Sequence, residues 1–296
     1  MMEVSTSPAP DLEDAVLCAE QAAAESRVDI GAVRDAEGAQ AVAQLFADVW
    51  RTGPEQAPVA PELIRGLAHT GSYVAAAYDD GSLVAASLAF RTAYGLHSHI
   101  SGVVDGARDR KIGFALKQHQ RAWALSVQLP LVTWTFDPLV RRNAWFNFTK
   151  LGAVGEEYLA DFYGVMNGVN AGDLSDRILA RWDLASSRSA DAARGMPQVY
   201  DEQDLRRKGA VTALDEGVDG EPVIHGVTPA ELVLARIPAD IVSLRLERPG
   251  VARSWRLALR ETLQPALAGD HELKGITRSG FYVLGASRST QEEGPR

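Results

Sequence analysis

A cluster of basic residues stands at the start of an expected helix. Residues 108–124 read RDRKIGFALKQHQRAWA, and Arg108, Arg110 and Lys111 stand next to a single glycine, Gly113. The first backbone N–H groups of a helix have no intrahelical partner, and the helix dipole is positive there. Cations are slightly unfavourable at that end, so three of them require an explanation. The pattern predicts a site for a phosphate or pyrophosphate group, and the alternative is a solvated basic corner.

Two histidines precede this turn on an expected strand over residues 95–104. His97 and His99 are two positions apart, and alternate residues of a strand point to the same face. Histidine titrates near neutral pH, which suits a general base. Hydrogen-bonded structural histidines are the alternative interpretation. His119 follows on the apolar stripe of the next helix, where we expect it to pack in the core.

The basic turn lies inside a strand–helix–strand unit over residues 96–138, and its helix is expected to end near Gln128. Ligands bind where such a strand ends and a helix begins. Before this unit the sequence predicts, in order, a strand at 28–35, helices at 36–50 and 61–70, and a hairpin at 72–90 that turns at Asp80-Gly81. After the strand at 129–138 it predicts a helix at 139–151 and strands at 155–164 and 177–184. A hairpin in the middle of this order excludes a purely parallel sheet and predicts a mixed one.

The composition limits the class of partner. A net charge of −9 disfavours a nucleic-acid binder, and a local basic cluster in an acidic chain favours a small anionic ligand. Cys18 is the only cysteine, which excludes an intrachain disulfide and a cysteine metal site. The sequence has no apolar run of membrane-spanning length, and its acidic start lacks a signal-peptide core. We therefore expect a cytoplasmic enzyme or binding protein with no membrane partner.

Two motifs resemble the GCN5-related N-acetyltransferase (GNAT) family. VVDGARDRKIGFALK, residues 103–117, is similar to the family's acetyl-CoA loop, R-G-x-G-x-G/A followed by a helix. Arg108, Gly113 and Leu116 match its spacing, although Asp109 and Lys111 stand where glycines are frequent. A register that begins at Arg110 fits as well. NAWFNFTKLGAV, residues 143–154, is similar to a later helix and strand of the family, with Ala144, Lys150 and Gly152 in register.

The resemblance covers about residues 28–184 and implies an α/β (α+β) fold. We expect a GNAT-like mixed, mostly antiparallel twisted sheet flanked by helices, and a smaller C-terminal α/β extension, as in one bacterial branch of the family. The expected domains are an N-terminal tail and helix at 1–27, an acyl-CoA-binding domain at 28–185, a linker at 185–197, the extension at 198–288 and a disordered tail at 289–296. In the extension, a helix over 251–268 is expected to be anchored by Trp255, Leu257 and Leu263. It can complete the acceptor cleft, extend the sheet or form a homodimer contact.

The resemblance also implies a cofactor and the residues that hold it. Acetyl-CoA or CoA would be the acyl donor, without a metal. Its pyrophosphate would lie on Arg108, Asp109, Arg110, Lys111, Ile112, Gly113 and Phe114. Val103 and Val104 would lie near the oxyanion, and Asn143 and Phe148 along the cofactor. Phe148 stands where the family often has a tyrosine that protonates the departing thiolate, and Tyr158 and Tyr163 are possible substitutes.

The implied reaction is direct attack of a small amine or amino acid on the thioester. The family's glutamate base is matched in position by His97, with His99 as orienter or second choice, and a carboxylate such as Asp137 is the alternative. Two other functions are compatible with the same motifs. One is a non-catalytic acyl-CoA-binding module, and the other is a GNAT-fold transferase with a different donor, such as aminoacyl-tRNA.

Overall fold

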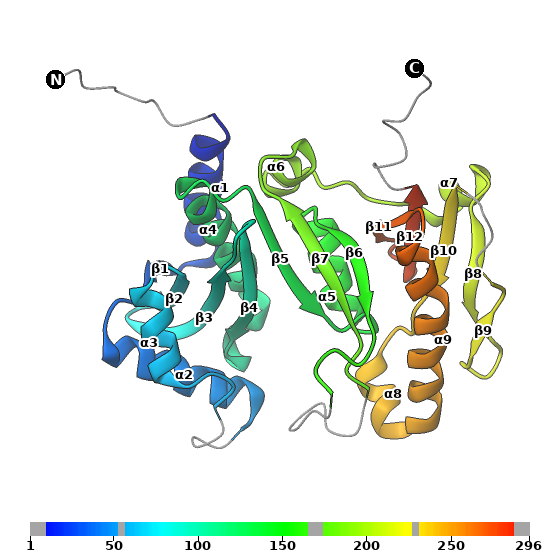
Figure 1. Ribbon diagram of the computed structural model, residues 1–296, viewed down its shortest axis with the longest axis horizontal. Coiled ribbons are helices and arrows are strands. Elements are labelled where there is room, and N and C mark those ends of the chain that lie inside the picture. Colours follow the sequence, from blue (N-terminus) through cyan, green and yellow to red (C-terminus); the bar gives the residue numbers. More distant parts are fainter. Residues whose placement is uncertain (1–9, 53–56, 165–173, 227–230, 287–296) are drawn as a thin grey trace. The chain divides into compact units, whose positions relative to one another are not determined.

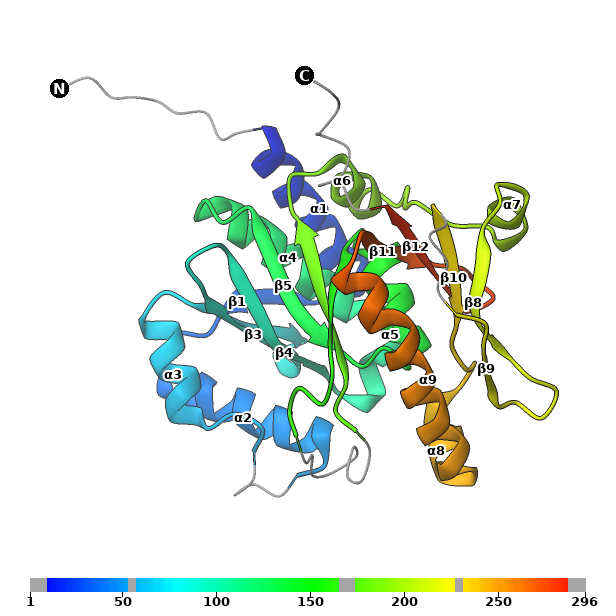
Figure 2. The same ribbon diagram turned by 45° about the vertical axis from the view of Figure 1, so that its right-hand side comes forward.

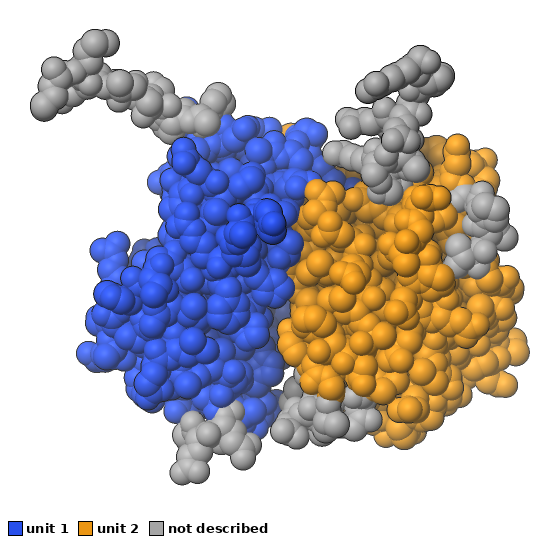
Figure 3. Space-filling model, in the orientation of Figure 1, with its two compact units in different colours: residues 1–133, 183–195 blue, residues 134–182, 196–296 orange. Residues whose placement is uncertain are grey.

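The computed structural model describes residues 10–52, 57–164, 174–226 and 231–286 (Figures 1 and 2). They form two compact units, coloured separately in Figure 3. Unit 1 comprises Met1–Thr133 and Asp183–Gly195, and unit 2 comprises Trp134–Trp182 and Met196–Arg296. Strand β5 (Leu131–Phe136) contributes its first residues to unit 1 and its last residues to unit 2.

Unit 1 is built on a mixed sheet. Its strands lie in the order β1 (Asp29–Ala32), β2 (Tyr73–Asp79), β3 (Ser82–Arg91), β4 (Leu96–Val103) and the start of β5. Neighbouring strands from β1 to β4 are antiparallel, whereas β4 and β5 are parallel. The predicted mixed, mostly antiparallel sheet is therefore confirmed.

The β2–β3 hairpin shows how local sequence sets this sheet. Asp80 has a φ of 47° and Gly81 a φ of 76°. A two-residue turn of this kind needs positive φ at both central positions, which aspartate tolerates and glycine adopts readily. The predicted Asp-Gly turn is confirmed.

Helices cover both faces of the sheet of unit 1. Val74, Ala76 and Leu88 pack against α2 (Ala36–Trp50) and α3 (Pro61–His69) in one apolar cluster. Ala77 and Ala85, on the opposite face, pack against Ile112 and Leu116. Both residues belong to α4 (Ile112–Ser126), which α1 (Pro10–Ser26) covers from its other side. Strand alternation thus separates the two helix layers.

Unit 2 contains the rest of the chain around a second part of the sheet. Its strand order is β5, β7 (Arg177–Asp183), β6 (Val154–Leu159), β11 (His271–Ile276), β12 (Phe281–Ala286), β10 (Leu232–Arg236), β8 (Val211–Glu216) and β9 (Pro222–Ile224). Its helices are α5 (Arg141–Trp145), which continues as the π-helix η3 (Phe146–Lys150), then α7 (Glu202–Arg207), α8 (Ile241–Glu247) and α9 (Pro249–Ala268). The predicted α/β character of the C-terminal part is therefore present.

Helix α9 buries one stripe in the core of unit 2. Trp255, Leu259 and Leu263 are fully buried and stand four positions apart, which brings them to one face of the helix. Leu257 is 43% exposed, so its prediction as an anchor is wrong. The physical reason is that two positions along a helix turn a side chain about 200° away from Trp255.

Other departures concern short elements. The expected linker at 185–197 contains helix α6 (Ser187–Ala193), whose start is capped by Ser186 through a hydrogen bond from the Ser189 N–H (3.2 Å). The linker prediction is wrong there because a serine cap and an alanine-rich run favour a helix. Helices α7 and α8 and strand β11 were not predicted either. The expected tail at 289–296 lies outside the described residues, and the domain division at 185 and 198 stays a prediction.

Candidate functional site

Strand β4 carries a β-bulge at His99. Ser98 lies opposite Ala89 of β3, and Ile100 lies opposite Leu88, so His99 is an extra residue in the ladder. Ser98 faces α4, whereas Ile100 packs in the cluster of α2 and α3. Bulges of this kind occur often beside active sites, because they redirect side chains and interrupt strand pairing.

Beyond the bulge, β4 extends past its ladder with β5. The parallel ladder joins Leu96 to Val132 and His97 to Thr133, and β4 continues to Val103. We call residues 98–103 the open stretch of β4, since within the described part of unit 1 none of them is paired with β5. Backbone groups of such a stretch can bind an extended ligand.

His97 is half-buried at the start of the open stretch. Its Nδ1 lies 3.0 Å from the Thr133 hydroxyl oxygen. Burial lowers the pKa of His97 below its usual value, and the nearby charges of His99 and Lys117 lower it further. The imidazole is therefore neutral at neutral pH, as a general base must be. If Nδ1–H donates to Thr133, Nε2 keeps the lone pair that accepts a proton.

His99 is exposed at the bulge itself. Its ring lies 5.0 Å from the ring of Phe90, which packs in the cluster of α2 and α3. Although the residue is exposed overall, partial desolvation of its ring lowers the pKa of His99. His97 lies opposite Phe90 in the ladder and the His99 ring lies beside the Phe90 ring, so both histidines are on the α2 side of β4, as the spacing predicted.

The basic turn consists of a 3₁₀ helix, Asp105–Arg110, followed by Lys111 in the left-handed region (φ 62°) and then α4. Each of its three cations has a carboxylate partner within unit 1. The pairs are Arg108–Asp105 (2.6 Å), Arg110–Asp79 and Lys111–Glu25 (3.4 Å). Much of the predicted basic cluster is thus already paired in the chain itself.

Arg110 is the most fully engaged of the three. Besides Asp79, its guanidinium donates to the carbonyl oxygens of Ser26 (3.0 Å) and Arg27 (3.3 Å) at the end of α1. The hydrogen bond with Asp79 raises the pKa of Arg110. Arg108 is 45% exposed and pairs with an exposed aspartate of its own turn. Arg108 can accordingly turn toward a ligand at a smaller cost than Arg110, and so can Lys111, whose pair with Glu25 is longer and also exposed.

The backbone at the start of α4 offers donors. The Lys111 carbonyl oxygen accepts from the N–H groups of Phe114 (2.9 Å) and Ala115 (3.1 Å). The N–H groups of Ile112 and Gly113 occupy the first helical positions, where a helix supplies no partner. Val104, by contrast, uses its N–H in a bond to the Val84 carbonyl oxygen (3.0 Å).

The space beside Gly113 is open. A Cβ built on Gly113 would meet only the Val103 Cγ2, at 3.9 Å, which is ordinary van der Waals contact. The fold of unit 1 therefore does not require glycine here. A glycine that its own protein leaves uncrowded suits the close approach of a ligand to the backbone.

The two predicted cofactor residues of unit 2 lie on the helix from 141 to 150. Asn143 is exposed, and its N–H donates to the Val140 carbonyl oxygen (2.9 Å). Phe148 is fully buried and packs edge-on against Phe136 and Tyr282, with ring centroids 5.6 and 6.1 Å away. Phe148 lies on the π-helical turn, a distortion frequently found at functional sites.

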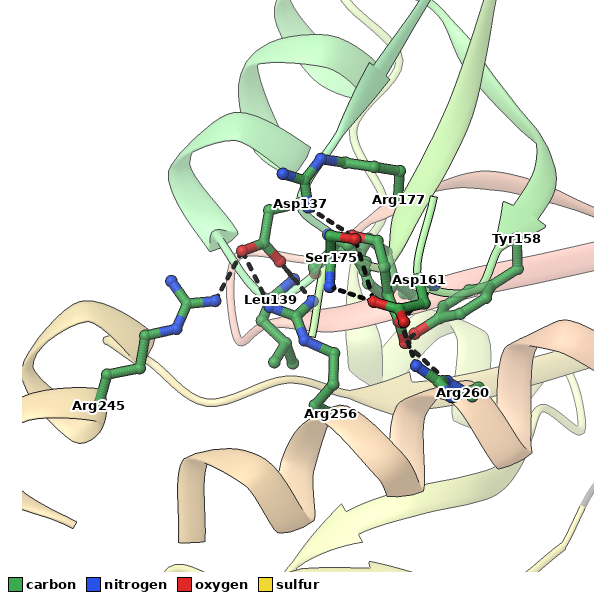
Figure 4. Close-up of polar contacts among 12 residues, drawn as sticks. Asp137, Leu139, Tyr158, Asp161, Ser175, Arg177, Arg245, Arg256 and Arg260 are labelled. Atoms are coloured by element: carbon green, nitrogen blue, oxygen red, sulfur yellow. Dashed lines mark hydrogen bonds and ion pairs between the residues drawn. The ribbon is translucent and has the colours of Figure 1, made fainter. Parts of the chain in front are cut away.

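Asp137, the alternative base, is held in a network of arginines (Figure 4). Its carboxylate accepts two hydrogen bonds from Arg256 (2.7 and 3.0 Å), one from Arg245 (2.7 Å) and one from the Leu139 N–H (3.0 Å). Although burial alone raises it, these guanidinium groups hold the pKa of Asp137 well below its usual range. A carboxylate so strongly stabilised in its ionised form is a poor general base.

The tyrosines considered as acids are also bound within unit 2. The Tyr158 hydroxyl donates to the Asp176 carboxylate (2.7 Å), which also accepts from Arg260 (2.9 Å). Burial and the neighbouring Asp176 charge raise the pKa of Tyr158. The Tyr163 hydroxyl lies 3.0 Å from that of Thr135. The Tyr158 hydroxyl is thus already hydrogen-bonded within the network of Figure 4.

Sequence reasoning missed the arginines of this network and the buried Lys117. Arg256 and Arg260 stand four positions apart and next to the apolar stripe of α9, a spacing that could have indicated a buried ionic face. Lys117 follows Leu116 directly and gave no such signal. It is buried because α4 is enclosed by the sheet on one side and α1 on another.

The described residues contain neither a candidate metal cluster nor a helix that could span a membrane. They contain no group of three or more histidine, cysteine, aspartate or glutamate side chains placed to hold a metal ion. Within the same ranges, every helix is too short or too polar to cross a bilayer.

No family model and no curated protein matches the sequence of this chain. Several solved structures resemble part of it. An acetyltransferase assigned to the GNAT family, from Desulfovibrio desulfuricans, is 18% identical with a TM-score of 0.44, over 53% of this chain and 99% of its own. The ribosomal-protein-S18-alanine N-acetyltransferase of Escherichia coli is 10% identical with a TM-score of 0.44, over 54% and 96%.

A third similar structure, an assigned acetyltransferase from Salmonella typhimurium, was solved with its cofactor acetyl-CoA. It is 12% identical with a TM-score of 0.44, over 53% of this chain and 94% of its own. Likenesses this distant establish neither the activity nor the ligand of the present chain. The fold class rests on the strand order and pairing described above.

Proposed function

We propose that this chain is an acyl-CoA-dependent N-acyltransferase of the GNAT type. It would move an acetyl or other acyl group to the amine of a small molecule or amino acid by direct attack. The observation that carries the proposal is the order of features along unit 1. An open stretch of β4 begins beside His97, contains a bulge, and leads through the basic turn to a helix start at Gly113.

The cofactor of this proposal is acetyl-CoA, and the turn fits a pyrophosphate in three respects. The Ile112 and Gly113 N–H groups stand at the helix start, the space beside Gly113 is open, and Arg108 is exposed. CoA would supply an activated thioester carbonyl. Along the open stretch, N–H groups near Val103 would stabilise the oxyanion that develops on it.

His97 is the proposed base. It would take a proton from the acceptor ammonium, and the lowered pKa keeps it ready to do so at neutral pH. His99 would orient the acceptor or His97.

Asn143 and Phe148 stay predicted cofactor contacts. A cytoplasmic location, the absence of a metal and a homodimer contact through α9 also stay predictions.

The test combines binding with turnover. Calorimetry with acetyl-CoA should show binding to the wild type, and CoA release should follow with some member of a panel of small amines and amino acids. Gly113→Val should weaken binding about ten- to hundredfold, because the side chain occupies the space of the phosphates. Gly66→Val is the matched control, since the Cβ position of Gly66 in α3 is likewise uncrowded, with nothing within 4 Å.

Each failure has a separate meaning. If the wild type does not bind acetyl-CoA, the proposed function is wrong. If Gly113→Val binds as well as Gly66→Val, the basic turn is not the phosphate site. Binding without CoA release across a broad panel would favour the non-catalytic acyl-CoA-binding module.

A further inference from the structure

A buried lysine lies beside the open stretch of β4. Lys117 of α4 is only 8% exposed, and its Nζ donates to the Ser98 hydroxyl oxygen (2.9 Å) and to the Gln120 side-chain oxygen (3.0 Å). Lysine is almost never this deeply buried, because removing an ammonium from water is costly. A lysine in this position is not required by the packing of α4, for which an apolar side chain would serve better.

Ser98 connects this lysine to the exposed part of the strand. Ser98 lies opposite Ala89, and Ser101 lies opposite Ser87, with the two hydroxyl oxygens of that second pair 2.7 Å apart. Ala89 and Ser87 alternate on β3, so Ser98 and Ser101 face the same side, toward α4. Ser98 is buried and Ser101 is exposed. The α4 side of the open stretch thus carries two hydroxyl groups, that of Ser98 beside Lys117 and that of Ser101 on an exposed residue.

His97 and Ser98 place two proton-carrying groups on opposite faces of one strand. They are consecutive residues, so His97 faces the α2 side and Ser98, with Lys117 behind it, faces the α4 side. His97 and Lys117 also interact electrostatically, because the Lys117 charge lowers the pKa of His97. A charged Lys117 therefore helps to keep His97 neutral.

We propose that the Lys117–Ser98 pair returns a proton to the sulfur of CoA, an assignment that rests on the proposed acyl transfer. The acceptor nitrogen forms a bond to the acyl carbon, and the carbon–sulfur bond breaks with its electron pair going to sulfur. The Ser98 hydroxyl gives its proton to that sulfur, and the Lys117 ammonium gives one to the Ser98 oxygen. Lys117 then regains a proton from solvent, while His97 releases the one it took from the amine.

The electrostatics of the site suit this role. Burial lowers the pKa of Lys117 to about 7, so both its charged and neutral forms are accessible at neutral pH. The titratable and charged groups on α4 and on the elements packed against it include Asp14 and Cys18 of α1, Tyr73 of β2, His97 and His99 of β4, and His119 and Arg121 of α4 itself. Others are Asp11, Glu13, Glu20 and Glu25 of α1, Tyr78 and Asp79 of β2, and Arg91 of β3. Asp14 is bound by Arg121 and Arg194, and Tyr73 by His119. Lys117, in contrast, donates to Ser98, a residue of the open stretch.

The decisive measurement is the pKa of the CoA thiol when CoA is bound to the full-length protein. It is followed by the ultraviolet absorbance of the thiolate during a pH titration, and it needs neither an acceptor nor turnover. Because the pKa of Lys117 is about 7, the neutral amine can take the thiol proton through Ser98, and the two groups titrate as a coupled pair. The thiolate should therefore appear roughly one pH unit below the ordinary thiol pKa of about 8.5. Lys117→Met should remove that shift, whereas Lys208→Met, at an exposed position of unit 2, should keep it.

Ser98→Ala provides the second arm. It leaves Lys117 in place but removes the hydroxyl that reaches the open stretch, so we expect the same loss of the shift. Both variants should bind CoA nearly as tightly as the wild type, which separates this role from that of the basic turn. With an acceptor found, Lys117→Met should also lose the fall in rate above about pH 7 that an acid of that pKa produces.

The outcomes distinguish the two proposals. A bound thiol with the same pKa in the wild type, Lys117→Met and Ser98→Ala overturns the role of the pair and leaves the proposed function intact. If Lys117→Met does not fold, Ser98→Ala decides in the same way. A wild type that binds no CoA overturns the proposed function and this assignment with it.

Discussion

Replacement of Asp137 by asparagine should destabilise the protein strongly, although the two side chains have nearly the same shape. The carboxylate is 14% exposed and accepts three hydrogen bonds from guanidinium groups, two of them from Arg256, which is 1% exposed. An asparagine can accept at one oxygen but carries no charge, and its amide group would face a guanidinium. The change therefore removes the negative partner of a buried cation.

The expected loss follows from that burial. Breaking a buried ion pair by removing one partner costs about 3–5 kcal/mol, because the remaining charge stays in a poorly solvated place. The contact with Arg245 lies nearer solvent and adds less. We therefore expect Asp137→Asn to lower the free energy of unfolding by about 3–5 kcal/mol at neutral pH.

The pH dependence of this loss has a definite sign. The folded-state pKa of Asp137 is depressed, so the ionised carboxylate stabilises the protein above its unfolded pKa, about 3.9. That stabilisation is lost as the pH falls from about 4 toward the folded-state value. The difference between wild type and Asp137→Asn should accordingly be constant from about pH 5 to 8 and shrink in stronger acid.

Urea unfolding followed by tryptophan fluorescence measures the effect, with Asp219→Asn as the control. Asp219 belongs to the same unit but is exposed, so the same substitution should change stability by less than about 0.5 kcal/mol. If Asp137→Asn loses no more stability than Asp219→Asn, the arginine network does not depend on the charge of Asp137. A loss that persists undiminished at low pH would contradict the ionic explanation.

Three further predictions follow from the site and from α9. Arg108→Ala should weaken acetyl-CoA binding by about ten- to hundredfold. Arg110→Ala should weaken it clearly less, because Asp79 and two carbonyl groups already bind the Arg110 guanidinium. Equal losses of affinity for the two variants in calorimetry would contradict this prediction. His97→Ala should lower kcat about a hundred- to ten-thousandfold and abolish the fall in rate on the acid side. In the wild type the midpoint of that fall should lie below pH 6.5, because the pKa of His97 is lowered. An unchanged pH profile in His97→Ala, together with an inactive His99→Ala, would assign the role to His99. Trp255→Ala should cost about 3–5 kcal/mol of unfolding free energy and Leu257→Ala under about 1 kcal/mol, and similar urea midpoints for the two would contradict the burial pattern of α9.

Local sequence predicted the elements around the site well. Residues 36–50 repeat apolar side chains at helical spacing behind a capping aspartate, and they form α2, with Asp35 accepting from the Gly38 N–H. Asp80-Gly81 specified its turn because few residues accept two positive φ angles in succession. The location of the basic turn between a strand and a helix could likewise be predicted, since the apolar side chains of both elements follow clear periodic patterns.

The short elements of the C-terminal part were less predictable. Helices α7 and α8 have six and seven residues, too few to show a clear helical period, and their positions depend on packing against the rest of unit 2. The expected linker became α6 because its polar residues suit a helix surface as well as a loop. Polarity alone does not distinguish a loop from an exposed helix surface.

The sequence by itself determined the order of the elements around the proposed site: a strand that carries two histidines, then a basic turn, then a helix. Only the tertiary structure decided which charges meet. Arg110 pairs with Asp79 across 31 positions, Asp137 with Arg256 across 119, and Lys117 donates to Ser98 across 19. Propensity and periodicity act over a few neighbouring residues, so they specify local conformation. Ion pairing and desolvation depend on distance and burial in space, which exist only once the elements have packed.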